Sequence, residues 1–179
     1  MKLRILLFIS LLFHITAYAQ TSGIKYTGIF QAGLLHGASE PSWQVQLVNG
    51  VSYKTFSLGI GVGFDHYSFK TLPLFADLRK NIFDRANTPF VYADYGTSLA
   101  LEDDISSPWV HYEYERGEYY DLGTGYSWSM KKRGSFIVSL GYTQKTVVEI
   151  RQYHWSPLPN GERIVDTLRR LVVKAGLRF

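Results

Sequence analysis

The chain contains no cysteine, and this absence excludes two kinds of exported protein. Without thiols no disulfide can cross-link the fold, and no lipid can be attached to a cysteine that follows a leader peptide. The stability of the fold must therefore come from packing and backbone hydrogen bonds, as it does when a sheet closes on itself.

The sequence also has little excess charge of either sign. Its formal net charge is +4 at pH 7, and removal of a leader containing Lys2 and Arg4 would leave +2. A surface that binds the phosphates of nucleic acid normally needs a marked basic excess. We therefore expect no nucleic-acid partner.

Long hydrophobic runs are the third absence. After the first 19 residues, no apolar run approaches the roughly 20 residues that a membrane-spanning helix requires. A transmembrane β-strand needs only about 9 to 11 residues, and only alternate residues of it face lipid. The mean hydropathy of −0.07 is therefore compatible with membrane strands.

What is present begins with the pattern of a secretory leader. Lys2 and Arg4 precede a short apolar segment, residues 5–13, and Ala17-Tyr18-Ala19 matches a small-x-small cleavage site. The apolar segment is too short to cross a bilayer as a helix. We expect residues 1–19 to be a cleaved signal peptide and residues 20–179 to form the mature domain.

The last nine residues, Leu171 to Phe179, alternate between apolar and polar side chains with the period of a β-strand. One face carries Leu171, Val173, Ala175, Leu177 and Phe179, and the other carries Lys174, Gly176 and Arg178. A final strand that ends on an aromatic residue is typical of outer-membrane β-barrels. We interpret Phe179 as a C-terminal assembly signal.

The same alternation occurs in seven other segments of the mature chain. They are residues 25–36, 42–48, 54–66, 71–80, 89–98, 118–129 and 135–145. Asn49-Gly50 supplies a hairpin signal between the second and third segments. With the terminal segment, they predict an all-β fold, an eight-stranded antiparallel up-and-down transmembrane β-barrel.

The lengths of the connections predict its orientation, because outer-membrane barrels have short periplasmic turns and longer external loops. The turns at Asn49-Gly50, residues 80–88 and residues 131–134 would be periplasmic. The connections over residues 37–41, 67–70, 99–117 and 146–168 would face outward. Both long connections then lie outside the cell.

Alternation alone does not separate a membrane barrel, apolar outside, from a secreted lipocalin-like barrel, apolar inside. The glycines favour the membrane barrel, because its narrow interior needs small residues. Those on the polar faces are Gly59, Gly61, Gly63, Gly96, Gly123, Gly125, Gly141 and Gly176.

The same polar faces carry four acids and four bases. Charges in a narrow lumen are costly unless they are paired. We predict a salt-bridge network that plugs the lumen, formed by Asp65, Asp77, Arg79, Asp94, Asp121, Lys145, Lys174 and Arg178.

Two external segments carry residues capable of chemistry. Glu102, Asp103 and Asp104 offer oxygen ligands for a divalent cation, but we favour the alternative that they form a solvated acidic tip. His154-Trp155-Ser156 resembles the His-x-Ser element of outer-membrane lipid A deacylases, but Pro157 follows where that family has Asn-Ala. His111 and His154 lack a third metal ligand. We expect no enzymatic activity and no cofactor or metal.

Three consecutive stretches carry a wider resemblance. Gly59 to Tyr67 (GIGVGFDHY), Thr71 to Arg79 (TLPLFADLR) and Thr88 to Asp94 (TPFVYAD) resemble the small outer-membrane β-barrel domain family of Bacteroidota, which is similar in architecture to PorT-like and OmpA-like barrels. The resemblance covers Gln20 to Phe179. It implies an outer-membrane location, contact with membrane lipid and lipopolysaccharide, and assembly by the barrel-assembly machinery. It carries no catalytic residue over to this chain.

The sequence therefore favours a non-enzymatic, structural or surface-interaction protein of the outer membrane, with its two long loops as the contact surface. Three alternatives stay open on the sequence alone: a lipid A-modifying enzyme, a narrow pore, and a soluble lipocalin-like binder.

Overall fold

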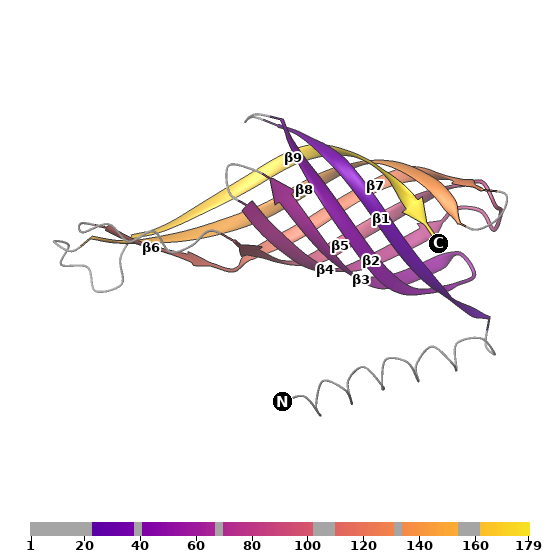
Figure 1. Cartoon of the computed structure of the whole chain (residues 1–179), viewed down its shortest axis with the longest axis horizontal. Coiled ribbons are helices and arrows are strands. Elements are labelled where there is room, and N and C mark those ends of the chain that lie inside the picture. The colour runs from indigo at the N-terminus through magenta and orange to yellow at the C-terminus, as the bar shows by residue number, and fades with distance from the viewer. Residues whose placement is uncertain (1–22, 38–40, 67–69, 102–109, 131–133, 154–161) are drawn as a thin grey trace, which may run out of the picture.

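The computed structural model describes residues 23–37, 41–66, 70–101, 110–130, 134–153 and 162–179. Nine β-strands lie in these ranges (Figure 1): β1 Ile24–Gly37, β2 Ser42–Tyr53, β3 Phe56–His66, β4 Lys70–Asn81, β5 Thr88–Ala100, β6 Val110–Glu115, β7 Gly117–Ser129, β8 Ser135–Tyr153 and β9 Glu162–Arg178. Within the same ranges, no helix is long and apolar enough to cross a membrane.

Eight of these strands form a closed antiparallel ring, which confirms the predicted eight-stranded barrel. The ring runs β1-β2-β3-β4-β5-β7-β8-β9, and β9 pairs back with β1. β6 pairs with β8 beyond the point where β7 begins, so it continues the line of β7 outside the ring.

Apolar side chains face outward and polar side chains face inward, as the glycines predict. Leu34 and Ile60 are 71% and 76% exposed, whereas Asp65 and Lys174 are each 1% exposed. The outward apolar belt also includes Phe30, Leu47, Phe56, Leu58, Leu74, Leu78, Leu122, Leu140, Leu171 and Val173. A lipocalin-like barrel requires the opposite orientation, so that alternative is wrong.

The predicted turn at Asn49-Gly50 is wrong. Both residues lie inside β2, where they pair with Gly28 and Thr27 of β1. Gly50 is needed for a different reason: a Cβ there would collide with the backbone carbonyl oxygen of Leu58 on β3. The chain turns instead at Lys54 and Thr55, and Lys54 adopts a left-handed backbone with φ of 53°.

The two long external loops are also shorter than predicted, because strands occupy much of them. β8 continues to Tyr153 and β9 begins at Glu162, so the predicted loop over residues 146–168 is mainly a β-hairpin. Part of the 99–117 loop forms β6, which pairs with β8. Together β6, β8 and β9 project from one end of the barrel as a ribbon (Figure 1).

We call the end with this ribbon the hairpin end and the opposite end, with Lys54, the 82–87 turn and Phe179, the turn end. The barrel interior is not purely polar between them. It contains a cluster of buried apolar and aromatic side chains: Ile29, Val48, Phe75, Phe90, Tyr92, Tyr119 and Ile137. Gly61 makes room for this cluster, because a Cβ there would collide with the ring of Phe75.

Candidate functional site

The lumen of the barrel is the candidate site, because it gathers the charged residues that the sequence singles out. Seven of the eight are almost fully buried: Asp65, Asp77, Arg79, Asp94, Asp121, Lys145 and Lys174. The eighth, Arg178, is partly buried near the turn end. Strand alternation turns all of them inward, and the ring brings residues from distant segments together.

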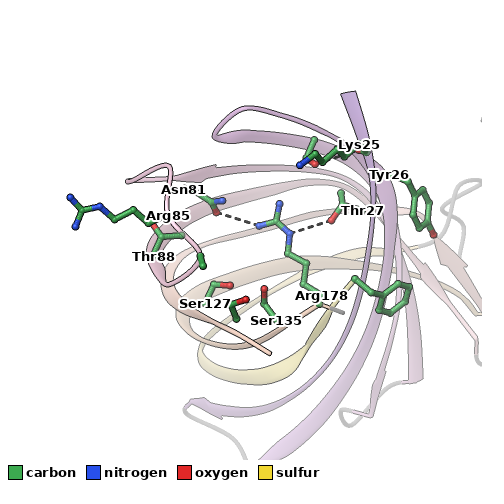
Figure 2. Close-up of a pocket in the computed structure, with 14 residues that line it drawn as sticks. Lys25, Tyr26, Thr27, Asn81, Arg85, Thr88, Ser127, Ser135 and Arg178 are labelled. Carbon is green, nitrogen blue, oxygen red and sulfur yellow. Dashed lines mark hydrogen bonds between the residues drawn. The ribbon is translucent and has the colours of Figure 1, made fainter. Parts of the chain in front are cut away.

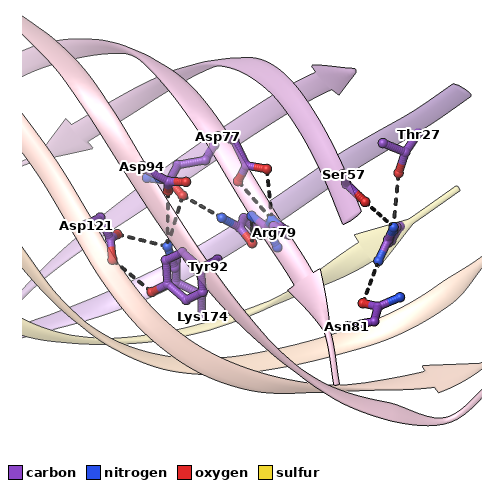
Figure 3. Close-up of polar contacts among 12 residues, drawn as sticks. Thr27, Ser57, Asp77, Arg79, Asn81, Tyr92, Asp94, Asp121 and Lys174 are labelled. Atoms are coloured by element: carbon purple, nitrogen blue, oxygen red, sulfur yellow. Dashed lines mark hydrogen bonds and ion pairs between the residues drawn. The ribbon is translucent and has the colours of Figure 1, made fainter. Parts of the chain in front are cut away.

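Lys174 is the centre of the network (Figure 3). Its Nζ lies 2.8 Å from Asp121 Oδ2 and 3.9 Å from Asp94 Oδ2. The same ammonium lies 4.1 Å from the centre of the Tyr92 ring, within the range of a cation–π interaction. The Tyr92 hydroxyl donates to Asp121 Oδ1 at 2.8 Å. One lysine therefore contacts two carboxylates, at 2.8 Å and 3.9 Å.

Those two carboxylates belong to a row of three. Asp77 is the register partner of Asp94, and Asp94 is the register partner of Asp121, so three aspartates lie side by side on β4, β5 and β7. Like charges directly opposite each other destabilise a sheet. The row therefore depends on the bases around it, Lys174 and Arg79.

Arg79 is the second base of the row. Its Nε donates to Asp77 Oδ2 at 2.8 Å. Its guanidinium also lies 5.7 Å and 5.4 Å from the ring centres of Phe90 and Tyr92. Such stacking suits a planar, weakly hydrated guanidinium better than an ammonium.

Neutral polar residues that were not predicted as part of the network extend it. Gln31 Nε2 donates to Gln46 Oε1 at 2.6 Å. Gln46 Nε2 in turn donates to the Tyr119 hydroxyl at 2.8 Å. These residues share the inward face with the charges, so the strand alternation was the signal that could have found them.

Nearer the hairpin end, Lys145 forms a second buried pair. Its Nζ lies 3.3 Å from Asp65 Oδ2 and donates to Thr71 Oγ1 at 2.7 Å. Several buried side-chain atoms have no hydrogen-bond partner among the described residues: both amide atoms of Gln44, Asp65 Oδ1, both carboxylate oxygens of Asp94 and Ser98 Oγ. Buried polar atoms of this kind are normally hydrated, so we expect ordered water among them.

Two further buried charges lie beyond the predicted strands. Arg170 on β9 is 4% exposed and donates to Ser42 Oγ at 2.9 Å. Glu149 on β8 is 7% exposed and accepts from Arg151 at 2.6 Å. Sequence reasoning missed both residues because it assigned their neighbourhood mainly to a loop.

At the turn end, Arg178 differs from Arg79, Lys145 and Lys174, which each pair with an aspartate. Its guanidinium donates to Thr27 Oγ1 at 3.2 Å, Asn81 Oδ1 at 3.3 Å and Ser57 Oγ at 2.7 Å. All three acceptors are neutral. Arg178 lines an open pocket of about 270 Å³ at the mouth of the barrel, shown in Figure 2.

Phe179 completes the seam between β9 and β1. Its amide and carbonyl exchange hydrogen bonds of 2.9 Å and 2.7 Å with Gly28. The ring lies over Gly28, where a Cβ would collide with it, and remains 57% exposed on the outer surface. The terminal residue is therefore held by both its backbone and its ring.

Deleting Phe179 is expected to lower the unfolding free energy by about 1–3 kcal/mol, the net value of two lost hydrogen bonds. Barrel insertion should fall with it. The measurement is the folded fraction on a gel before and after boiling, since folded barrels migrate differently. Phe179→Leu keeps the backbone bonds and serves as the control. An unchanged folded yield after deletion would contradict an assembly role.

The other candidate residues lie outside the description. Glu102, Asp103, Asp104, His154, Trp155 and Ser156 are not among the described residues, and His111 is placed only through its backbone in β6. Among the described residues, no group of three or more His, Asp or Glu side chains is arranged to hold a metal ion.

Comparison with known proteins adds evidence on the fold. No protein family and no curated protein sequence matches this chain. The crystal structure of the outer membrane protein OprG from Pseudomonas aeruginosa is similar, with a TM-score of 0.55 at 12% identity over 87% of this chain and 94% of OprG. The solid-state NMR structure of the outer membrane protein AlkL in DMPC lipid bilayers gives a TM-score of 0.52 at 12% identity, over 86% and 88% of the two chains.

At this level of identity the likeness establishes the fold alone. The chain is an eight-stranded β-barrel with the architecture of small outer-membrane proteins.

Proposed function

We propose that this protein is an integral outer-membrane β-barrel that acts as a non-enzymatic structural or surface-interaction protein with a closed lumen. The outward apolar belt supports membrane insertion, because soluble monomers rarely expose so large a continuous apolar surface. The likeness to OprG and AlkL supports the outer membrane as its location. Export would use residues 1–19 as a cleaved leader.

The closed lumen rests on one observation: hydrogen bonds join strands on opposite sides of the ring at three levels. Near the turn end, Arg178 of β9 donates to Asn81 of β4. At the centre, Gln46 of β2 donates to Tyr119 of β7. Towards the hairpin end, Lys145 of β8 reaches Asp65 of β3. In each case four steps around the ring separate the two strands, so these side chains span the full width of the lumen.

A closed lumen predicts that the purified protein gives no unitary current steps in planar lipid bilayers. The contacts that cross the lumen support this prediction, because side chains that fill a narrow barrel interrupt the hydrated path that ions need. Combining Gln46→Ala, Lys145→Ala and Arg178→Ala removes the crossing contact at each of the three levels and should leak ions above the wild-type level, whereas Lys70→Ala on the exterior should not. Current steps that scale with the amount of wild-type protein would favour the narrow-pore alternative.

The ribbon of β6, β8 and β9 is the proposed contact surface. It extends the barrel at the end opposite the short turns. We assign this hairpin end to the outside of the cell. The ribbon carries an exposed ion pair, Arg163 with Glu115 at 3.3 Å. Membrane lipid and lipopolysaccharide are its proposed neighbours, and the barrel-assembly machinery its proposed insertion partner. Membership of the Bacteroidota family remains a prediction from resemblance.

A further inference from the structure

The pocket at the turn end has an unbalanced charge. Its lining includes three basic side chains, Lys25, Arg85 and Arg178, and no aspartate or glutamate among the described residues. Phe179 also lines the pocket, and its main-chain carbonyl oxygen already accepts from Gly28. Hydroxyl groups of Thr88, Ser127 and Ser135 also line the pocket. Bases and hydroxyl donors without a side-chain acid favour an anion.

Arg178 is the residue that aims into this pocket. Figure 2 shows it reaching from β9 into the opening of the barrel, between Thr27 and Asn81 on one side and Ser127 and Ser135 on the other. Lys25 and Arg85 lie on the rim and are exposed. They therefore contribute a positive field at the entrance, whereas Arg178 supplies direct contacts.

The guanidinium of Arg178 lacks the counter-charge that comparable lumen bases have. Lys145 pairs with Asp65, Lys174 pairs with Asp121, and Arg79 pairs with Asp77. Arg178 has only neutral acceptors, and Asp77, an acid of the same lumen, is already bonded to Arg79. A partly buried cation without an acid is stabilised by an external anion.

The guanidinium also has donors to spare. An arginine side chain carries five N–H groups in a planar fork. Three of them are used by Thr27, Asn81 and Ser57, one on each nitrogen. The two that remain are on Nη1 and Nη2, and this arrangement matches the paired oxygens of a phosphate. The pocket volume of about 270 Å³ exceeds the roughly 30 Å³ that one water occupies.

We propose that the turn-end pocket is a binding site for a phosphate group, with Arg178 as its principal contact and Lys25 and Arg85 attracting the ligand. The phosphate comes either from the headgroup of an anionic phospholipid at the membrane surface or from a soluble phosphate. The lipid source rests on the proposed membrane location, whereas binding of inorganic phosphate does not.

The test begins with folded, detergent-solubilised full-length protein titrated with inorganic phosphate at constant ionic strength, followed by ³¹P NMR line broadening. Arg178→Gln removes the charge and should weaken binding at least tenfold, and Arg178→Lys should lie between it and the wild type. Lys70→Gln, an exposed base at the hairpin end, is the matched control and should bind like the wild type.

Two additions make the outcome decisive. If Arg178→Gln does not fold, a Lys25→Gln, Arg85→Gln double variant keeps the bonds of Arg178 and should still weaken binding severalfold. Native mass spectrometry of protein extracted from membranes identifies the source: retained anionic phospholipid that is lost in the variants indicates a headgroup, and phosphate binding without retained lipid indicates a soluble ligand.

Equal phosphate binding by wild type and variants, or no binding in either experiment, would overturn the proposal. Gel migration before and after boiling reports barrel formation separately. Failure of the phosphate site with an intact barrel is therefore distinguishable from failure of the proposed function.

Discussion

Replacing Lys174 by methionine is expected to lower the unfolding free energy by about 3–5 kcal/mol, the typical effect of removing one partner from a buried ion pair. Lys174 is the closest base to Asp121 and also lies near Asp94, and all three side chains are almost fully buried. Methionine preserves much of the side-chain volume, so the loss reports mainly the uncompensated charge. Urea unfolding of the reconstituted barrel, followed by tryptophan fluorescence, measures it.

Two comparisons isolate the electrostatic cause of this loss. Lys70→Met changes an exposed lysine and should shift stability by less than about 0.5 kcal/mol. Combining Lys174→Met with Asp121→Asn removes one of the carboxylates left without a base. The double variant should recover about 1–3 kcal/mol of unfolding free energy, because residues in contact couple energetically. If Lys174→Met were as stable as the wild type, the lumen network would not be stabilised by its ion pairs.

An arginine placed on the outer surface should lower the unfolding free energy by an amount that depends on its position along the barrel axis. Ile60 lies in β3 within the apolar belt and is 76% exposed. Ile60→Arg is expected to cost about 2–4 kcal/mol, since the charge would enter the hydrocarbon region. Val165 in β9 is also exposed on the outer surface. It lies 14 residues before Phe179, in the projecting ribbon. Val165→Arg should cost about 0–1 kcal/mol.

The same unfolding measurement in lipid vesicles tests this pair of variants. Equal costs at the two sites would contradict the proposed position of the membrane. Ile60→Leu serves as the conservative control and should change stability by less than about 1.5 kcal/mol. The contrast also separates a membrane barrel from a soluble one, in which both exposed sites would tolerate arginine.

The alternation of apolar and polar residues predicts the inward and outward faces of a strand correctly where the two faces meet different environments. Between Phe56 and Asp65, every outward residue is apolar and every inward residue is small or acidic, and the structure has the same alternation. At the start of the projecting ribbon the two faces of the strand no longer differ in this way. Val147 and Val148 are adjacent and both buried, so alternation could not predict that β8 continues to Tyr153.

The sequence predicts which residues face the lumen, but not which of them contact each other. The inward face of each strand is fixed by parity, but the partner of each residue depends on register. Register depends on where the chain turns, and the turn after β2 is at Lys54 rather than Asn49. The row of Asp77, Asp94 and Asp121 across three strands is therefore a property of the folded sheet that no local pattern contains.

The pairing of Ile29 with Arg178 has a kinetic consequence. Because the first and last strands of the ring must meet before any edge is removed, the barrel cannot gain its final stability until β9 has paired with β1. Loop closure over so long a separation is slow, and an unfinished intermediate carries two unpaired edges that invite aggregation. For the outer-membrane protein proposed above, survival before insertion would then depend on how long such intermediates are shielded, more than on the stability of the finished barrel.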